Sequence, residues 1–285
     1  MRVLVTGAGG QLATDLVSVM AADAVTALNH AQLDITSNQA VLAAMERHQP
    51  DAVINTAAYH QVDRCETEPE LSFAINAAAT QRLAIACRNA GVLLVHLSTD
   101  YVFNGLKREP YDEGDPVAPL SVYGASKAGG EMAVRATTDR HLIVRTTGLY
   151  GQAGRSRPRG NFVETMLKLA DQQAPIAVVS DQVLTPSYTL DVAWAISALI
   201  HAGARGTVHV TSAGQCSWYE FAAHIFECMK LHPNLTAIAQ AQRPAAARRP
   251  AYSVLGHRRL RELGIPEPPP WQDALAAYLG ARSRI

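Results

Sequence analysis

Short segments rich in β-branched residues alternate with helical patterns through the first half of the chain, and this alternation restricts the possible folds more than any other feature. The sequence predicts strands over residues 2–6, 24–28, 52–55, 92–97 and 141–145, and helices over residues 11–20, 38–48, 71–89 and 121–136. Residues 92–97 are continuously apolar, as in a strand buried on both faces. Alternation of this kind is typical of parallel βαβ units, so we predict an α/β fold with a doubly wound parallel sheet.

The regular alternation ends near Tyr150. Beyond it the sequence predicts helices over residues 162–170, 190–200, 218–229 and 271–279, strands over residues 176–179 and 207–210, and an irregular segment over residues 243–250. We therefore predict a Rossmann-type dinucleotide-binding domain over residues 1–150 and a smaller, mixed α/β substrate lobe over residues 151–285. Segments of the two parts are able to interleave.

Composition excludes several classes of function. Lys and Arg together number 25, as do Asp and Glu, so the chain lacks the basic excess of a nucleic-acid-binding protein. The longest apolar stretch, Val192 to Ile200, is too short to span a bilayer, and no secretory signal is visible. The four cysteines and ten histidines are scattered, which argues against a disulfide scaffold or a metal site and predicts free, buried or half-buried thiols. We expect a cytoplasmic protein with a small-molecule substrate.

The first motif with chemical meaning is Gly7-Ala-Gly-Gly10-Gln-Leu-Ala13, which follows a predicted strand and begins a predicted helix. Gly7 permits a tight turn, Gly10 lets a diphosphate approach the backbone, and Ala13 permits close packing of helix and strand. The amides at the start of the helix then face the diphosphate. An ordinary turn between a strand and a helix also favours glycine, so the motif alone leaves that alternative open.

The kind of dinucleotide is left open by the second predicted strand. It ends in Asn29-His30, with neither an acid for a ribose 2′-hydroxyl nor an arginine for a 2′-phosphate. Asp34 and Ile35 follow, and Asp34 either contacts the adenosine or caps a turn. The cofactor is therefore expected to be NADPH or NADH.

The second motif is Tyr123-Gly-Ala-Ser-Lys127 at the start of a predicted helix, where the spacing places both side chains on one face. A nearby ammonium favours the phenolate and lowers the pKa of a tyrosine, which makes the hydroxyl useful for proton transfer. Thr99 follows a predicted strand at the edge of the sheet where doubly wound folds bind ligands, and it offers a hydroxyl to the same carbonyl oxygen. Without such partners, Tyr123 is simply a half-buried helix residue.

Together these residues resemble the extended short-chain dehydrogenase/reductases and, within them, the dTDP-4-dehydrorhamnose reductase family. The resemblance covers nearly the whole chain, and its most specific strings are Ser98-Thr-Asp-Tyr-Val-Phe103 and Pro119-Leu-Ser-Val-Tyr-Gly124. Other matching pieces are Leu33-Asp-Ile-Thr36, residues 50–58, Val62-Asp63, Glu68-Pro-Glu-Leu71, Asn161-Phe162, Asp181-Gln182, Cys216-Ser-Trp-Tyr219 and Arg249-Pro-Ala-Tyr-Ser253.

The resemblance implies reduction of the C4 ketone of a nucleotide-linked 6-deoxy sugar, dTDP-4-dehydro-L-rhamnose, to dTDP-L-rhamnose. It implies catalytic roles for Tyr123 as proton donor, for Lys127 and for Thr99. The cofactor-binding residues that it implies are Gly7, Gly10, Gln11, Leu12, Asp34, Ile35, Ala57, Ala58, Tyr59, Tyr123 and Lys127. The substrate-binding residues that it implies are Thr99, Asp100, Tyr123, Gly148, Asn161 and Arg249.

The chain departs from the family pattern after the fifth predicted strand. The usual Thr-Ser-Trp-x-Tyr is here Thr146-Thr-Gly-Leu-Tyr150, so Gly148 replaces an aromatic wall and the pocket is expected to gain room. Arg155, Arg157 and Arg159 lie in a loop that either binds the diphosphate of the substrate or is simply solvated.

Three functions remain open: the rhamnose reductase, a reductase of another nucleotide-linked keto sugar, and a non-catalytic regulatory subunit resembling the β subunit of methionine adenosyltransferase. The oligomeric state, monomer or homodimer, and the stereochemistry at C4 are also open. In some relatives acids at a subunit interface hold a metal; Asp15 stands where one such acid would be, or is a plain surface acid.

Overall fold

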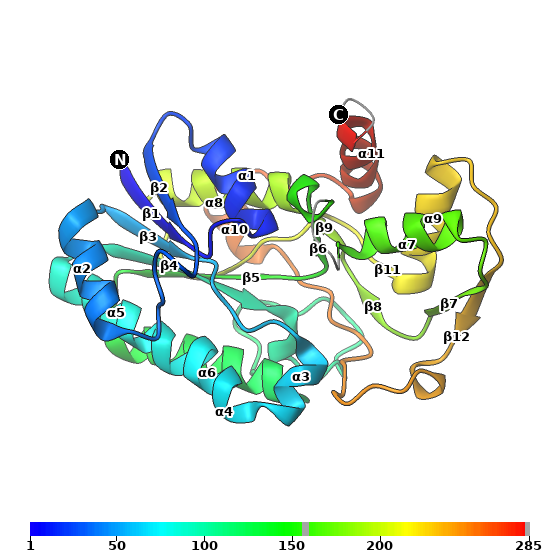
Figure 1. Ribbon diagram of the computed structural model, residues 1–285, viewed down its shortest axis with the longest axis horizontal. Helices are drawn as coiled ribbons and strands as arrows, with labels where there is room; N and C mark the ends of the chain where they lie inside the picture. Colours follow the sequence, from blue (N-terminus) through cyan, green and yellow to red (C-terminus); the bar gives the residue numbers. More distant parts are fainter. Residues whose placement is uncertain (156–159, 283–285) are drawn as a thin grey trace.

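The computed structural model describes residues 1–155 and 160–282, which form a six-stranded parallel sheet with helices on both faces and a smaller lobe beside its carboxyl edge (Figure 1). The strand order is β10-β5-β4-β3-β1-β2. The strands are β1 (Arg2–Thr6), β2 (Ala24–Leu28), β3 (Ala52–Asn55), β4 (Leu93–Thr99), β5 (His141–Thr146) and β10 (Gly206–His209). The predicted α/β class and doubly wound parallel sheet are confirmed.

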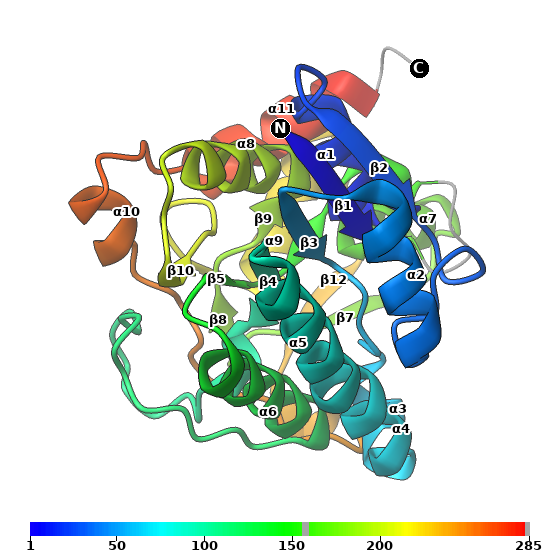
Figure 2. The ribbon, with the colours of Figure 1, turned by 90° about the vertical axis from the view of Figure 1, so that its left-hand side faces the viewer.

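Helices lie on both faces of the sheet (Figure 2), and alternate residues of a strand pack against opposite layers. Val3 and Val5 of β1 pack with α1 (Gln11–Val19), α8 (Thr189–His201) and α10 (Arg258–Glu262). Leu4, between them, packs with α2 (Asn38–His48), α5 (Thr80–Ala90) and α6 (Val122–Thr137) on the other face. Because side chains alternate along a strand, a sheet covered on both faces buries every position, as in β4, all seven of whose residues are buried.

The helix predicted over residues 71–89 is in fact longer and interrupted. It consists of α4 (Pro69–Phe73), the π-helical segment η1 (Ala74–Ala79) and α5. A short helix, α3 (Val62–Thr67), precedes it and was not predicted. Ser37 caps α2, since its hydroxyl accepts a hydrogen bond from the Ala40 amide at the start of that helix.

The smaller lobe has its own core, rich in aromatic side chains. Its helices are α7 (Phe162–Asp171), α9 (Trp218–Cys228) and α11 (Trp271–Arg282). Its short strands pair as β6 (Leu149–Tyr150) with β9 (Ser187–Tyr188), β7 (Ile176–Val179) with β12 (Leu235–Ile238), and β8 (Val183–Leu184) with β11 (Cys216–Ser217).

Two elements from the second half of the chain belong to the large sheet unit. β10 pairs with β5 at the edge of the sheet, and α8 packs beside α1. The chain therefore passes from the sheet unit to the lobe and back, and the division at residue 150 does not separate the two parts in space. Over the described residues, no helix is long and apolar enough to cross a membrane.

Candidate active site

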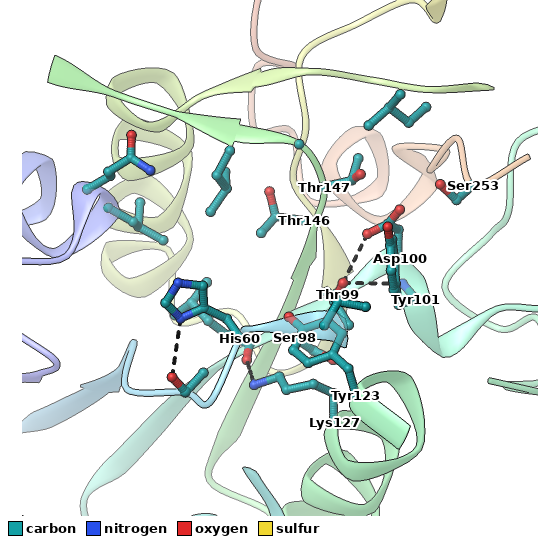
Figure 3. Close-up of a pocket in the computed structure, with 18 of the residues that line it drawn as sticks. His60, Ser98, Thr99, Asp100, Tyr101, Tyr123, Lys127, Thr146, Thr147 and Ser253 are labelled. Atoms are coloured by element: carbon teal, nitrogen blue, oxygen red, sulfur yellow. Dashed lines mark hydrogen bonds between the residues drawn. The ribbon is translucent and has the colours of Figure 1, made fainter. Parts of the chain in front are cut away.

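A cavity of about 370 Å³ lies where the carboxyl ends of the strands meet the smaller lobe. The sheet unit contributes the start of α1, the loop after β3, the end of β4 and the first turns of α6 (Figure 3). The lobe contributes Gln182, Val183 and Leu184 after β7, Trp218 at the start of α9, and Pro250 and Ser253. The lining includes Gly10, Gln11, Leu12, Ala13, Thr56, Ala58, His60, Ser98, Thr99, Asp100, Tyr101, Tyr123, Lys127, Thr146, Thr147, Gly148, Gln182, Leu184, Trp218 and Ser253.

The glycine-rich turn has the shape expected of a diphosphate cradle. Gly7 has a φ of +77°, and a Cβ there would lie 2.8 Å from both the Ala57 amide nitrogen and the Thr56 hydroxyl. Gly10 precedes α1 in an extended conformation, without a side-chain cap on the helix. The first amides of a helix have no partner within the helix, so this end of α1 suits an anion. Ala13 is fully buried against the sheet. The residues present therefore fit a dinucleotide.

Asp34 and Ile35 lie outside this cavity. Asp34 Oδ1 accepts hydrogen bonds from the amide and the hydroxyl of Thr36 at 2.9 and 2.8 Å, and the Thr36 hydroxyl in particular lowers the pKa of the carboxyl. Asp34 thus caps a turn, which was one of its two expected roles. Ile35 is buried in the core between the sheet and α2. Their contact with the adenosine stays a prediction.

Two other expected cofactor residues also lie outside the cavity. Ala57 packs against Gly7, and its amide donates to Asn55 Oδ1 at 3.2 Å. The Tyr59 hydroxyl donates to Glu68. Ala58, between them, does line the cavity.

Thr99, Tyr123 and Lys127 meet on one side of the cavity (Figure 3). Thr99 ends β4, and its hydroxyl donates to Asp100 Oδ1 at 3.0 Å. Tyr123 and Lys127 lie in the first two turns of α6, which the Ser121 hydroxyl caps. A Cβ at Gly124 would lie 2.2 Å from the Tyr101 carbonyl oxygen, so only glycine lets α6 approach the end of β4 this closely.

Burial controls the protonation of this group. Burial raises the pKa of Tyr123, and a hydrogen bond with Thr99 opposes the rise. Burial lowers the pKa of Lys127 to about 8, although Glu131 opposes the change. Lys127 Nζ donates to the Leu97 carbonyl oxygen and lies 3.5 Å from His96 Nε2. Burial is the largest influence on the Tyr123 hydroxyl, and the lowering of its pKa by Lys127 stays a prediction.

Asp100 is the acid of the cavity. Its side chain is buried, and burial raises its pKa from 3.8 to about 6, against hydrogen bonds from Ser253, Thr147 and Thr99. The carboxyl therefore changes protonation just below neutral pH.

Gly148 lines the cavity, and the expectation that it makes the pocket roomier than in relatives stays a prediction. Its φ is +57°, and a Cβ there would lie 3.1 Å from both Leu184 Cδ1 and Pro186 Cα. The Leu184 side chain thus fills the space beside Gly148. An aromatic wall is nevertheless present, since Trp218 lines the cavity and packs on Phe162 with a ring separation of 4.5 Å.

The cavity residues Gln182, Leu184, Trp218 and Ser253 had no assigned role in the sequence, and neither had His60. Gln182, Trp218 and Ser253 stand within strings that carry the family resemblance, which is the signal that marked them. Their spatial grouping depends on how the lobe packs.

Two expected substrate contacts lie outside the cavity. Asn161 is buried and caps α7, accepting a hydrogen bond from the Glu164 amide at 3.0 Å. Arg249 forms an ion pair with Asp63 at 2.8 Å. Arg155 lies 3.5 Å from the Gln152 amide oxygen, whereas Arg157 and Arg159 fall outside the described residues.

No cluster of three or more His, Cys, Asp or Glu side chains that suits a metal is found within residues 1–155 and 160–282. All four cysteines are free thiols; Cys228 is exposed and the others are buried.

Comparison with known proteins identifies the family. The family model described as RmlD substrate binding domain matches residues 1–283. A probable dTDP-4,6-dihydroxy-2-methyloxan-3-one 4-ketoreductase of Streptomyces antibioticus is 43% identical, over 96% of this chain and 93% of its own. A dTDP-4-dehydrorhamnose reductase of Streptomyces griseus is 40% identical, over 96% of this chain and 91% of its own.

Among solved structures, the dTDP-4-dehydrorhamnose reductase of Bacillus anthracis in complex with NADP superposes with a TM-score of 0.94 at 38% identity, covering 98% of this chain and 99% of that one. The resemblance seen in the sequence is confirmed. The chain therefore belongs to the RmlD substrate binding domain family, nucleotide-sugar reductases of the short-chain dehydrogenase/reductase type that depend on NAD(P)H.

Proposed function

We propose that this protein reduces the C4 ketone of dTDP-4-dehydro-L-rhamnose to give dTDP-L-rhamnose, using NADPH or NADH. The observation that carries the proposal is the meeting of Thr99, Tyr123 and Lys127 in the same cavity as the glycine-rich turn. The relative from Streptomyces griseus and the Bacillus anthracis structure, both dTDP-4-dehydrorhamnose reductases, support this substrate.

The chain's own residues position the reactants and supply the proton. Gly10, Gln11, Leu12, Ala58 and Lys127 would hold the cofactor, and bound NAD(P)H supplies a hydride to the C4 carbon. Tyr123 Oη gives its proton to the ketone oxygen, while the Thr99 hydroxyl binds that oxygen.

The Tyr123 hydroxyl is protonated at neutral pH before transfer, and the raised pKa by itself opposes release of the proton. The ammonium of Lys127 favours the phenolate that remains after transfer.

The second candidate is reduction of a different nucleotide-linked keto sugar. Leu184 beside Gly148 shapes the cavity differently from the tryptophan usual in the family, and the relative from Streptomyces antibioticus is a probable 4-ketoreductase of another dTDP sugar. The same catalytic residues serve both reactions. Only the sugar differs.

The test is oxidation of NADPH and of NADH with enzymatically generated dTDP-4-dehydro-L-rhamnose, followed at the nicotinamide absorbance. We expect rapid oxidation with dTDP-L-rhamnose as the product, and the two rates settle the choice of cofactor. Oxidation only with another keto sugar would establish the second candidate. Binding of a dinucleotide without turnover of any keto sugar would overturn both and favour a non-catalytic binding role.

Tyr123→Phe tests the proton donor. We expect turnover to fall about 10²–10⁴-fold, because the variant removes the acid and leaves the ring. The Kd for NADP⁺, measured by calorimetry, should remain within about twofold of the wild-type value. Tyr111→Phe is the matched control, since the Tyr111 hydroxyl binds Asn104 outside the cavity. A Tyr123→Phe enzyme with a wild-type rate would end the assignment.

A further inference from the structure

The side chain of Gln11 reaches from the glycine-rich turn to the smaller lobe. Gln11 is the first residue of α1, directly after the glycine-rich turn. Its Oε1 atom accepts hydrogen bonds from the Gly151 amide at 2.8 Å and from Asn161 Nδ2 at 3.1 Å. The oxygen end of the Gln11 side chain therefore joins the turn to the lobe.

Asn161 is the centre of this junction. Besides Gln11, its Nδ2 lies 3.1 Å from the Gly151 carbonyl oxygen and 3.2 Å from the Tyr278 hydroxyl. Its Oδ1 accepts from the Glu164 amide, which caps α7. Both ends of the amide are thus engaged, and the donor end faces acceptors only.

The junction is enclosed, so it holds one arrangement. Asn161 is only 7% exposed. A Cβ at Gly154 would lie 2.4 Å from Gln11 Oε1 and 2.7 Å from Asn161 Nδ2, which shows how closely the chain packs over the two amides. A buried hydrogen bond is costly to leave unmade, because water cannot replace the lost partner.

The lobe side of the junction leads to the cavity wall and to the C-terminal helix. Phe162, next to Asn161, packs on Trp218, which lines the cavity. The Tyr278 hydroxyl of α11 binds Glu164 Oε1 at 2.8 Å, and Arg282 binds the same oxygen at 3.0 Å. The Asn161 side chain thus links these parts of the lobe to Gln11, which also accepts a hydrogen bond from the Gly151 amide.

We propose that Asn161 is a positioning residue for cofactor binding: acting through Gln11, it fixes the turn formed by Gly10, Gln11 and Leu12. This inference rests on the proposed function, and it replaces the expected role of Asn161 as a substrate contact. A turn that is already held in its binding conformation binds the cofactor more tightly, because less conformational entropy is lost on association.

The experiment uses Asn161→Asp, which keeps a good helix cap but replaces the Nδ2 donor with an oxygen that faces Gln11 Oε1 and the Gly151 carbonyl. We expect the Kd for NADP⁺ to rise about tenfold and the Kd for dTDP to change by less than about twofold. If the aspartate variant does not fold, Asn161→Ser replaces it, because serine keeps a cap without reaching Gln11. It too should weaken NADP⁺ binding and leave dTDP binding nearly unchanged. Ser37→Asp at the start of α2 is the control for a cap substitution elsewhere.

A double-mutant cycle on the Kd for NADP⁺ tests whether Asn161 acts by positioning Gln11 or only through the general stability of the fold. Gln11→Ala should weaken NADP⁺ binding at least as much as Asn161→Ser does, because it also removes the bond from the Gly151 amide. The double variant should be no weaker than Gln11→Ala alone, since Asn161 acts through Gln11. Additive losses, or an unchanged Kd for NADP⁺, would overturn the inference. A loss confined to dTDP would also overturn it and restore Asn161 as a substrate contact. Failure of the wild-type protein to bind NADP⁺ is a separate result, which contradicts the proposed function itself.

Discussion

At the scale of single residues, Asp100 links catalysis to stability. Burial raises its pKa to about 6, so the folded protein keeps this proton to a higher pH than the unfolded chain does. The resulting contribution to the free energy of unfolding is fully present below about pH 4 and is lost as the pH rises through about 6. Above that range the fold bears the cost of a buried, charged carboxylate.

Asp100→Asn should therefore stabilise the protein near neutral pH. At about pH 8 we expect the free energy of unfolding of the variant to exceed that of the wild type by up to about 3 kcal/mol, so the variant melts at a higher temperature. This difference in free energy should shrink towards about pH 4. Thermal unfolding across that range measures it, with the exposed Asp139→Asn as control. A difference that does not vary with pH would contradict the assignment. The same variant should lose activity, because Asp100 lines the cavity.

Replacement of Gly148 is unfavourable on two grounds. Its φ of +57° costs other residues about 1–2 kcal/mol, and a Cβ would press against Leu184 and the Pro186 backbone. We expect Gly148→Trp to destabilise the fold rather than to restore the usual aromatic wall, and to weaken dTDP-rhamnose binding. Gly203→Ala isolates the backbone cost, since Gly203 has a φ of +70° and open space around it. Equal melting temperatures for Gly148→Ala and Gly203→Ala would show that contacts with Leu184 and Pro186 add nothing to the cost of replacing Gly148.

At the scale of elements, the packing of α6 on the π-helical segment η1 depends on one glycine. A Cβ at Gly130 would lie 2.3 Å from the Asn76 carbonyl oxygen and 3.2 Å from His96 Nε2, next to Lys127. A Cβ at Gly129 would meet Ala77 Cβ only at 3.4 Å. Adjacent glycines in one helix thus have different functions.

We expect Gly129→Ala to stabilise the protein by about 0.5–1 kcal/mol, because alanine is the better helix former. Gly130→Ala should destabilise it by more than about 2 kcal/mol, because α6 must move away from η1. Chemical denaturation of both variants measures the two effects. Destabilisation by both substitutions to the same extent would mean that the approach of α6 to η1 is not what requires Gly130.

The sequence predicted the elements that have a period and a cap, and it missed those that have neither. The strand over residues 24–28 and the helix over residues 38–48 have the predicted bounds, since their apolar spacing and the cap at Ser37 are local signals. Two-residue strands such as β8 and β11 contain no period, and they form because the lobe packs around them. The π-helical segment η1 packs closely on α6, and no local pattern in the sequence predicted its conformation.

The same distinction applies to the site. Thr99, Tyr123 and Lys127 were predictable because a strand end and a helix start place them. Asn161 and Arg249 were predicted to contact the substrate. In the structure each has a protein partner in the other part of the chain, Gln11 and Asp63 respectively. Contacts between residues so distant in sequence leave no trace in either segment.

At the scale of the whole molecule, the lobe is joined to the sheet unit on opposite sides of the cavity. One junction is that of Gln11 with Asn161. The other is made by residues 247–253, which approach α3: the Ala247 amide donates to Asp63 Oδ1 at 3.1 Å, and Arg249 Nη2 binds Asp63 Oδ2 at 2.8 Å. Pro250 and Ser253, in the same segment, line the cavity. The first junction touches the cofactor turn, and the second borders the part of the cavity proposed for the sugar.

Asp63→Asn should therefore separate the two binding events in the opposite sense to Asn161→Asp. We expect the KM for the nucleotide sugar to rise about 3–10-fold, because the segment that carries Pro250 and Ser253 is held less firmly, while the Kd for NADP⁺ stays within about twofold. The melting temperature should barely change, since Asp63 is 49% exposed and exposed ion pairs contribute at most about 1 kcal/mol. Asp51→Asn is the matched control: its ion pair with Arg2 is of similar exposure but involves the start of β1, away from the cavity. If Asp63→Asn weakened NADP⁺ and sugar binding equally, the two junctions would not act on separate parts of the site.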